Sequence, residues 1–215
     1  MSRPQADFDN YFQQRAHRFA RFYRSEAAAR LLGRGPIFDR LRMTVEDIVR
    51  LRARRVLDVG CGSGPLFAPL AGRGIRVTGL DPAPAMVALA RENAANYPDL
   101  IEVQQRRWED LAEQDCYDVA VALGVFDYVD EPAELLRRMS RAAPCVIASF
   151  PGPGLRLELR KIRYGARGVH VHPYRADGFD RLAGMADLQA GRIRPLGRAG
   201  HVVQFLRQPA QCGPR

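Results

Sequence analysis

The sequence predicts an α/β fold of the Rossmann-like type, with a mostly parallel sheet covered by helices on both faces. Three observations support this. From residue 55 onward, short apolar runs alternate with helical stretches, the first run leads into glycines at positions 60, 62 and 64, and the second ends in Asp81. Such alternation favours parallel strands joined by right-handed crossovers, with ligands bound at the carboxyl ends of the strands. We therefore expect a binding site at that edge of the sheet.

The first fifty residues predict helices rather than strands. Residues 7–50 place aromatic, aliphatic and arginine side chains at spacings closer to 3.6 than to 2. This period is typical of amphipathic helices, and the segment Gly33-Arg34-Gly35-Pro36 interrupts it. Two or three helices are therefore expected ahead of the sheet.

The remaining elements follow from apolar runs and from turn residues. Pro84 suits the first turn of a helix, and the run 117–123 is apolar enough for a strand buried on both faces. The last two strands lie close enough in sequence to pair as an antiparallel hairpin, which gives seven strands. Strands are predicted over 55–59, 76–80, 101–104, 117–123, 145–150, 192–196 and 201–206, and helices over 65–72, 84–93, 131–139 and 176–188.

Composition narrows the class of protein. A chain of 215 residues fits one domain, and it has no apolar stretch of about 18 residues that would predict a membrane span. Residues 1–5 lack the apolar core of a signal peptide. The four cysteines are scattered without metal-ligand spacing, so we expect a cytoplasmic protein with reduced thiols and no metal site.

The net charge of +9 is concentrated in two segments. Residues 1–55 carry a net +7 and residues 155–168 a net +4, so the remainder of the chain carries a net −2. One interpretation is an anionic substrate or partner, with RNA as a less favoured option. The other is compositional bias, because Lys161 is the only lysine in the chain.

The glycine loop and the carboxylate after the next strand predict a nucleotide-like ligand. A backbone that passes close to a ligand needs residues without Cβ, as at Gly60, Gly62 and Gly64. Asp81, which stands 21 residues after Gly60, is placed to accept hydrogen bonds from two ribose hydroxyls. Alternatively, the glycines only make turns, Asp81 caps the following helix, and Asp58 orients its own loop.

The run from Val56 to Gly64, with Gly-x-Gly-x-Gly spacing and an acid two residues ahead, resembles the first motif of the class I S-adenosylmethionine-dependent methyltransferases. The resemblance covers residues 54–207 and implies S-adenosyl-L-methionine as cofactor. It also implies a helical lid over residues 1–53, a cofactor-binding domain over 54–208 and a flexible tail over 209–215. The cofactor-binding residues that it implies are Asp58, Gly60, Cys61, Gly62, Gly64, Asp81, Pro82, Trp108, Leu123 and Gly124.

The expected adenine pocket departs from the pattern of the family. Family members place an acid and then a hydrophobic residue after the third strand, whereas Arg107 and Trp108 stand there in this chain. Trp108 could offer a flat face to the purine, or it could simply fill the core. Arg107 cannot accept a hydrogen bond, so another acceptor, such as a backbone carbonyl, is needed for the adenine amine.

The acceptor side is predicted from a narrower resemblance. Segments 124–129, 148–151, 160–164 and 172–174 resemble a branch of bacterial enzymes related to magnesium-protoporphyrin O-methyltransferase. This implies that residues 151–175 form a basic, substrate-side insertion. The substrate-binding residues that it suggests are Tyr11, Arg160, Lys161, Arg163 and Tyr174. The alternatives are a solvated cationic helix face and, for Tyr11, an aromatic contact that only holds the N-terminal arm against the sheet.

Three residues are catalytic candidates. Asp127 and Tyr128 follow the fourth strand in the loop over the site, although Asp127 could instead cap the next helix. His172 is a candidate general base, because the pKa of histidine lies near neutrality. His170 and His172 point the same way in an extended segment, yet no third ligand for a metal is evident.

Together these features predict a methyltransferase that acts on the oxygen of a small or medium anionic molecule. Methyl transfer from a sulfonium mainly requires in-line placement of the nucleophile, so the lack of a catalytic triad does not argue against an enzyme. A nicotinamide-dependent oxidoreductase, a non-catalytic S-adenosylmethionine-binding protein and, less favoured, an RNA methyltransferase remain as alternatives.

Overall fold

The computed structural model describes residues 26–31, 35–111, 117–154, 157–158, 161–162, 165 and 170–208. Tyr11, Arg160 and Arg163 lie outside these residues, as do most of the expected lid and the tail. The strands are β1 (Arg55–Val59), β2 (Arg76–Asp81), β3 (Ile101–Gln105), β4 (Val119–Leu123), β5 (Cys145–Pro151), β6 (Leu188–Pro195) and β7 (Gly200–Arg207). The α-helices are α2 (Glu26–Leu31), α3 (Gly35–Arg50), α4 (Phe67–Ala71), α5 (Pro84–Ala94), α6 (Pro132–Ala142) and α8 (Phe179–Met185). Three short 3-10 helices are η2 (Trp108–Asp110), η3 (Ala176–Gly178) and η4 (Gly197–Ala199).

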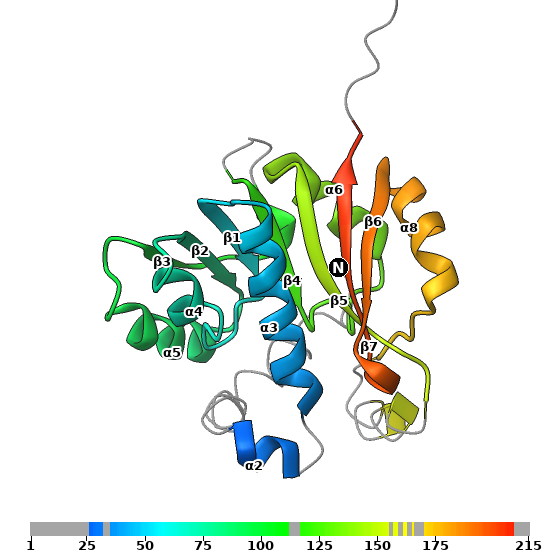
Figure 1. Ribbon diagram of the computed structural model, residues 1–215, viewed down its shortest axis with the longest axis horizontal. Coiled ribbons are helices and arrows are strands. Elements are labelled where there is room, and N and C mark those ends of the chain that lie inside the picture. Colours follow the sequence, from blue (N-terminus) through cyan, green and yellow to red (C-terminus); the bar gives the residue numbers. More distant parts are fainter. Residues whose placement is uncertain are drawn as a thin grey trace, which may run out of the picture.

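The seven strands form one sheet in the order β3-β2-β1-β4-β5-β7-β6 (Figure 1). Strands β1 to β5 are parallel, and β7 runs antiparallel to both β5 and β6. The expected sheet and its closing hairpin are confirmed. The chain order reverses between β1 and β4, and ligands of such sheets bind outside the carboxyl ends of the strands at that point.

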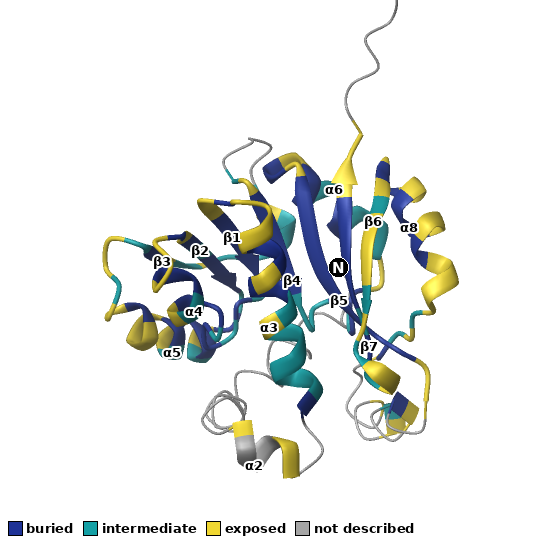
Figure 2. Ribbon diagram, viewed as in Figure 1, coloured by how far each residue is buried: buried dark blue, intermediate teal, exposed yellow. Residues whose placement is uncertain are grey.

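Two apolar layers hold the helices against the sheet. On one face Ile48 of α3, Phe67 of α4 and Ala90 of α5 belong to the same buried cluster. On the other face α6 and α8 contribute Leu135 and Phe179 to a second buried cluster. Strands β4 and β5 are buried between these layers, whereas β6 is an exposed edge (Figure 2). The core therefore lies under the strand ends where the sequence predicts the site.

Some element boundaries were predicted wrongly. The helix predicted over 176–188 is a 3-10 turn followed by α8, which ends at Met185, and β6 begins at Leu188. Asp187 has φ +58°, a left-handed backbone conformation that ends the helix. The strand was predicted to begin at residue 192, but it begins four residues earlier, at Leu188, which is buried in the core. In the part of the chain that the structure describes, no helix is long and apolar enough to cross a membrane.

Candidate cofactor and acceptor site

The glycine loop is fixed by hydrogen bonds to the elements around it. The Cys61 amide donates to the Leu80 carbonyl at the end of β2 (2.9 Å), and the Gly64 amide donates to the Cys61 carbonyl (2.9 Å). The Asn93 side chain, from α5, donates to the Ser63 carbonyl (2.7 Å). The loop is therefore a rigid bend at the carboxyl ends of β1 and β2.

The structure requires glycine at these three positions of the loop for different reasons. All three have positive φ: +68° at Gly60, +57° at Gly62 and +77° at Gly64. A Cβ at Gly60 would lie 2.4 Å from the Val125 side chain, and one at Gly64 would lie 2.3 Å from the ring of Phe67. A Cβ at Gly62 would meet nothing within 4 Å. Gly60 and Gly64 are thus required by packing within the protein, and Gly62 presents its backbone to open space.

Asp81 joins the glycine loop to the start of α5. Its two carboxylate oxygens accept hydrogen bonds from the amides of Gly62 (3.0 Å) and Ala83 (2.9 Å). Only 8% of the residue is exposed. Ala83 is the N-cap residue of α5, so this hydrogen bond fixes the chain just before the first turn of the helix. A carboxylate has further lone pairs, however, and can also accept from ribose hydroxyls.

Asp58 is buried beside this pair. Burial in the sheet and then the charge of Asp81 raise the pKa of Asp58 from 3.8 to about 7. Burial, and then the charges of Asp58 and Asp81, raise the pKa of the Cys61 thiol, so this cysteine remains a neutral thiol within the loop. A cationic ligand group next to Asp58 would favour its ionised form.

Stability of the unliganded protein should therefore decrease with pH. The raised pKa means that the folded protein binds a proton more tightly at Asp58 than the unfolded chain does. Between pH 3.8 and about 7, the free energy of unfolding should fall as pH rises, by about 4 kcal/mol at most, and should then level off. Urea unfolding across this range measures the slope, and Asp58→Asn should remove this component. An unchanged slope in that variant would contradict the assignment.

The end of β4 receives a guanidinium that the sequence analysis missed. Gly124 has φ +81°, and its amide donates to the hydroxyl of Ser149 on β5 (2.9 Å). A Cβ at Gly124 would lie 3.0 Å from Nη1 of Arg40, which comes from α3. Leu123, just before this glycine, is half-buried. The site thus combines buried carboxylates on the β1–β2 side with one guanidinium at the end of β4.

The region after β3 is less regular than the expected adenine pocket. Trp108 is half-buried in η2, and the guanidinium of Arg138 lies 5.9 Å from its ring. Arg107 precedes this turn in an extended conformation. Among the described residues, Trp108 Nε1 and Glu109 Oε2 are buried without a hydrogen-bond partner. Glu109, which the sequence analysis did not select, thus places a carboxylate next to Trp108 in this turn.

The segment 170–174 packs against the loop after β4. The His172 amide donates to the Asp127 carbonyl (2.9 Å), and its ring Nε2 lies 3.0 Å from Oδ1 of Asp130. The Tyr174 amide donates to the Pro151 carbonyl (2.9 Å), and its hydroxyl donates to the Phe126 carbonyl (3.2 Å). The structure therefore brings Asp127, His172 and Tyr174 together at the ends of β4 and β5.

These residues differ in what they can do chemically. Burial, and then the charges of Asp127 and Asp130, raise the pKa of Tyr174, so its hydroxyl stays protonated and cannot serve as a general base. The amide of Tyr128 closes a turn onto the Val125 carbonyl (3.0 Å). Lys161 forms an exposed ion pair with Glu158 (3.0 Å), which fits the solvated-face alternative. Among the described residues no group of three or more potential ligands could hold a metal ion.

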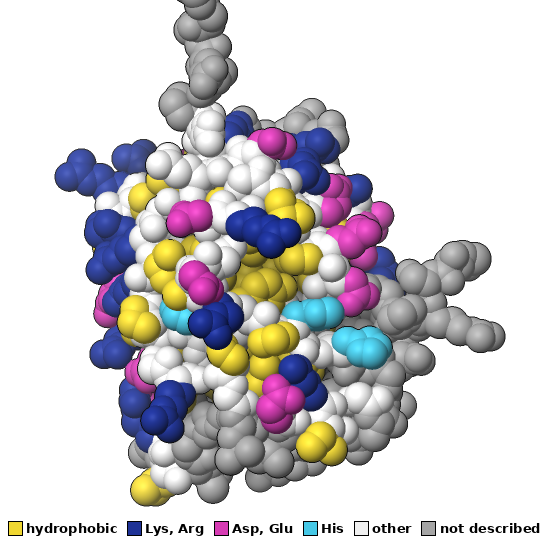
Figure 3. Space-filling model, turned by 90° about the vertical axis from the view of Figure 1, so that its right-hand side faces the viewer, with side chains coloured by type: hydrophobic (Ala, Val, Ile, Leu, Met, Phe, Trp, Pro, Cys, Tyr) yellow, Lys and Arg dark blue, Asp and Glu magenta, His cyan; other side chains and the backbone are white. Residues whose placement is uncertain are grey.

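The molecular surface beside β6 and α8 carries charges of both signs. Basic and acidic side chains both appear on it, around an apolar area, and histidine side chains lie near that area (Figure 3). The basic segment 155–168 contributes only a few described residues. The described surface here therefore gives the nucleic-acid alternative no added support.

Comparison with known proteins shows what the chain is similar to. Residues 56–143 match the model of a methyltransferase domain. This match and the relatives below confirm the predicted resemblance to the class I S-adenosylmethionine-dependent methyltransferases. The ubiquinone biosynthesis O-methyltransferase of Pseudomonas savastanoi pv. phaseolicola is 35% identical over 99 residues, which are 45% of this chain and 43% of that protein. The protein of the same name from Aeromonas salmonicida is 34% identical over 114 residues, 52% of this chain and 44% of its own length. The chain thus spans less than half the length of these curated relatives.

Two solved structures show the same fold. The magnesium protoporphyrin IX methyltransferase of Synechocystis PCC 6803, solved with bound S-adenosylmethionine, matches with a TM-score of 0.73 at 19% identity over 97% of this chain and 99% of that one. The 1,6-didemethyltoxoflavin-N1-methyltransferase of Burkholderia thailandensis also matches with a TM-score of 0.73, at 16% identity over 97% of this chain and 92% of that one. None of these matches supports the nicotinamide-dependent alternative. One of these structures is named for N-methylation, whereas the curated relatives are named for O-methylation, so the likeness does not decide the acceptor atom.

Proposed function

We propose that this chain is an S-adenosylmethionine-dependent methyltransferase that methylates an oxygen atom of a small or medium anionic molecule. The observation that carries the cofactor assignment is the open backbone face at Gly62, whose amide is held by the buried Asp81 carboxylate. This arrangement lies at the point where the strand order reverses, the place where such sheets bind ligands. We also propose a cytoplasmic location, which the free thiols of Cys61 and Cys145 favour.

The polar groups of the site complement the parts of that cofactor. Asp81 would accept from the ribose hydroxyls, and Asp58 would face the ammonium of the methionine moiety, directly or through water. Arg40 would bind its carboxylate, because a guanidinium is suited to two parallel hydrogen bonds with a carboxylate. The adenine would lie beside Trp108, with Glu109 accepting from its amine. The other lining residues of the proposal are Gly60, Cys61, Gly64, Pro82, Leu123 and Gly124.

The acceptor side uses the residues of the 170–174 segment. When bound, the cofactor supplies an electrophilic methyl carbon; the chain must then orient the nucleophile and manage its proton. His172, oriented by Asp130 at 3.0 Å, would accept the proton of an acceptor hydroxyl. The hydroxyl of Tyr174 and the loop residues Asp127 and Tyr128 would orient the acceptor. Tyr11, Arg160, Lys161 and Arg163 remain proposed contacts for its anionic group.

The proposal that the methylated atom is an oxygen is supported by the names of the relatives and not by the geometry of the site. The curated relatives are O-methyltransferases of ubiquinone biosynthesis, and the segments around β4 and β5 resemble the protoporphyrin branch. We also propose that residues 1–53 close over the site as a lid and that residues 151–175 form the acceptor side of the 54–208 domain.

Calorimetry with S-adenosylhomocysteine and with NADH tests the cofactor. Binding of the first and not of the second is expected, and the reverse would overturn the proposal. Purified protein is then incubated with methyl-labelled S-adenosylmethionine and a small-molecule extract. Label in an organic product that resists phosphatase and nuclease treatment supports a small acceptor, and alkaline release of labelled methanol distinguishes a methyl ester from a methyl ether. Label found only in RNA, or none despite tight binding, would contradict it.

A further inference from the structure

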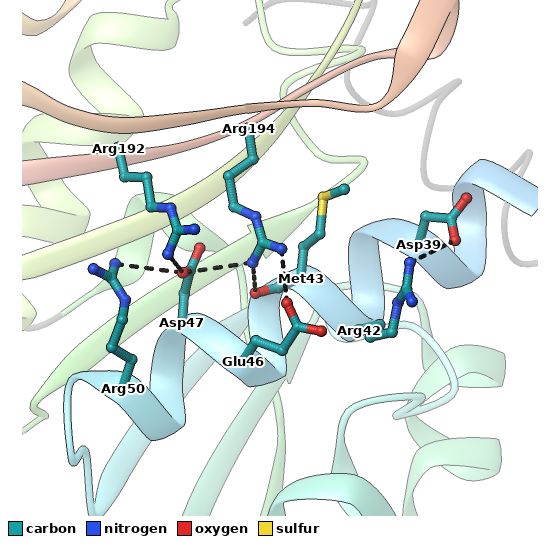
Figure 4. Close-up of polar contacts among 8 residues, drawn as sticks. All are labelled: Asp39, Arg42, Met43, Glu46, Asp47, Arg50, Arg192 and Arg194. Carbon is teal, nitrogen blue, oxygen red and sulfur yellow. Dashed lines mark hydrogen bonds and ion pairs between the residues drawn. The ribbon is translucent and has the colours of Figure 1, made fainter.

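Helix α3 is held by a polar cluster far from the glycine loop in sequence. Asp47 of α3 is 1% exposed, and its Oδ1 lies 3.1 Å from Arg192 Nη1 and 3.6 Å from Arg194 Nη1. Both arginines come from the edge strand β6 (Figure 4). Arg50, one turn further along α3, adds a third contact at 3.4 Å. The last strand but one of the chain is therefore tied to a helix that precedes the sheet. We call Asp47, Arg192 and Arg194 the β6 latch.

Arg194 fixes the helix at more than one point. Its Nη1 also donates to the Met43 carbonyl (3.0 Å), and its Nη2 pairs with Glu46 (2.7 Å). Only 18% of its side chain is exposed. One guanidinium thus contacts a carbonyl and two carboxylates within a single turn of α3. Such a contact specifies both the rotation of the helix and its position along its axis.

The latch is a costly way to hold a helix that already has an apolar face. Val45 and Ile48 bury α3 against the sheet without any charge. A buried carboxylate must be fully compensated to be neutral in energy, yet Asp47 Oδ2 has no hydrogen-bond partner among the described residues. The buried atoms Thr44 Oγ1 and Gln204 Nε2 lack partners in that part of the chain as well. The arrangement favours a role in specifying geometry over a role in stability alone.

The geometry of an α-helix connects the latch to the cofactor site. Arg40 stands seven residues before Asp47, and seven residues at 3.6 per turn bring a side chain back to nearly the same face of the helix, about 10.5 Å along its axis. The guanidinium of Arg40 lies at Gly124, just after β4, and the carboxylate of Asp47 contacts Arg192 on β6. A rotation or slide of α3 permitted by loss of the latch would therefore move the Arg40 guanidinium away from Gly124.

We propose that Asp47, Arg192 and Arg194 are positioning residues that set the affinity for the amino-acid end of the cofactor by holding α3, and through it Arg40, in register with β4. This rests on the proposed function, because it assumes that Arg40 meets the carboxylate of the bound cofactor. The latch does not touch the ligand. Its effect should be confined to ligands that carry the carboxylate.

The experiment compares one ligand that carries the amino-acid end, with its carboxylate and ammonium, and one that lacks it. Dissociation constants for S-adenosylhomocysteine and for 5′-methylthioadenosine, which lacks the amino-acid carboxylate, are measured by calorimetry in the full chain. Arg194→Met should raise the first constant about tenfold and leave the second within twofold, and Arg194→Lys should recover part of the loss. Arg192→Met serves as a second, more exposed variant should Arg194→Met not fold. Arg42→Met is the matched control, because the side chain of this arginine of α3 is 65% exposed and pairs with Asp39 (3.2 Å) on the same helix.

A double-mutant cycle with Arg40→Met decides whether the latch acts through Arg40. That variant alone should raise the constant for S-adenosylhomocysteine at least tenfold, and adding Arg194→Met to it should change the constant no further. Equal weakening of both ligands by Arg194→Met, or effects of Arg194→Met and Arg40→Met that multiply, would overturn the proposal. Failure of the unaltered protein to bind S-adenosylhomocysteine would instead overturn the proposed function.

Discussion

Asp81→Ala is expected to raise the dissociation constant for S-adenosylhomocysteine by about 100-fold or more. The substitution removes two charge-assisted hydrogen bonds to the ribose, each worth about 1.5–3 kcal/mol. It also leaves the amides of Gly62 and Ala83, which now donate to this carboxylate, without their acceptor. The loop that should cradle the ligand would lose one of its hydrogen bonds to β2 at the same time and keep the one from the Cys61 amide to the Leu80 carbonyl. Calorimetry at constant pH measures the loss.

Asp81→Asn separates the charge from the hydrogen bonds. Asparagine keeps one acceptor oxygen at the same place, so it should retain one of the two amide contacts and give an intermediate dissociation constant. The charge of Asp81 contributes to the raised pKa of Asp58, so the asparagine variant should lower that pKa. The fall of stability with pH should then level off at a lower pH. An Asp81→Ala protein that binds the ligand as tightly as the unaltered chain would refute the ribose assignment.

Most of the fold could be predicted because its signals are local. The strands of the parallel sheet are short apolar runs, and β4 and β5 are buried from end to end, or nearly so. Once the strands are known, the carboxyl edge of the sheet brings Gly60, Asp81 and Gly124 together with no further information. The boundary near Asp187 was predicted wrongly because a single left-handed residue, rather than a change of hydrophobic period, ends the helix there.

Arg40 could not be selected from the sequence because its importance depends on how α3 docks. It is one of thirteen arginines in residues 1–55, and no motif distinguishes it. A usable signal was nevertheless present. Asp47 lies on the same side of α3 as the buried Thr44, three residues earlier, and an acid on a buried side of a helix requires a partner from another element. Asp130 was missed for a related reason, since its pairing with His172 spans 42 residues.

The glycine motif has a second physical reason that the sequence does not show. The three glycines are predicted to bind the cofactor, and a Cβ at two of them, Gly60 and Gly64, would also overlap side chains of this protein. The ring of Phe67 lies against both Gly64 and Gly79, so it occupies the space under the loop. Spacing alone cannot tell a glycine that admits a ligand from one that admits a phenyl ring, because both need the same lack of Cβ.

A pair of alanine substitutions should separate these two roles. Gly64→Ala is expected to destabilise the fold by about 3 kcal/mol, because its Cβ would overlap the buried Phe67 ring and its backbone has φ +77°. Gly62→Ala should cost only about 1 kcal/mol of backbone strain, since its Cβ meets nothing. Urea unfolding measures both free energies.

Ligand binding should respond in the opposite order. In Gly62→Ala the new methyl group would stand in the space proposed for the methionine moiety, so affinity for S-adenosylhomocysteine should fall at least 30-fold, roughly 2 kcal/mol, in a protein that is nearly as stable as the original. Gly64→Ala, studied at a temperature where it remains folded, should lose less free energy of ligand binding than free energy of unfolding. If Gly62→Ala binds normally, the open face at that glycine is not where the cofactor lies, and the pocket must be sought elsewhere along the carboxyl edge of the sheet.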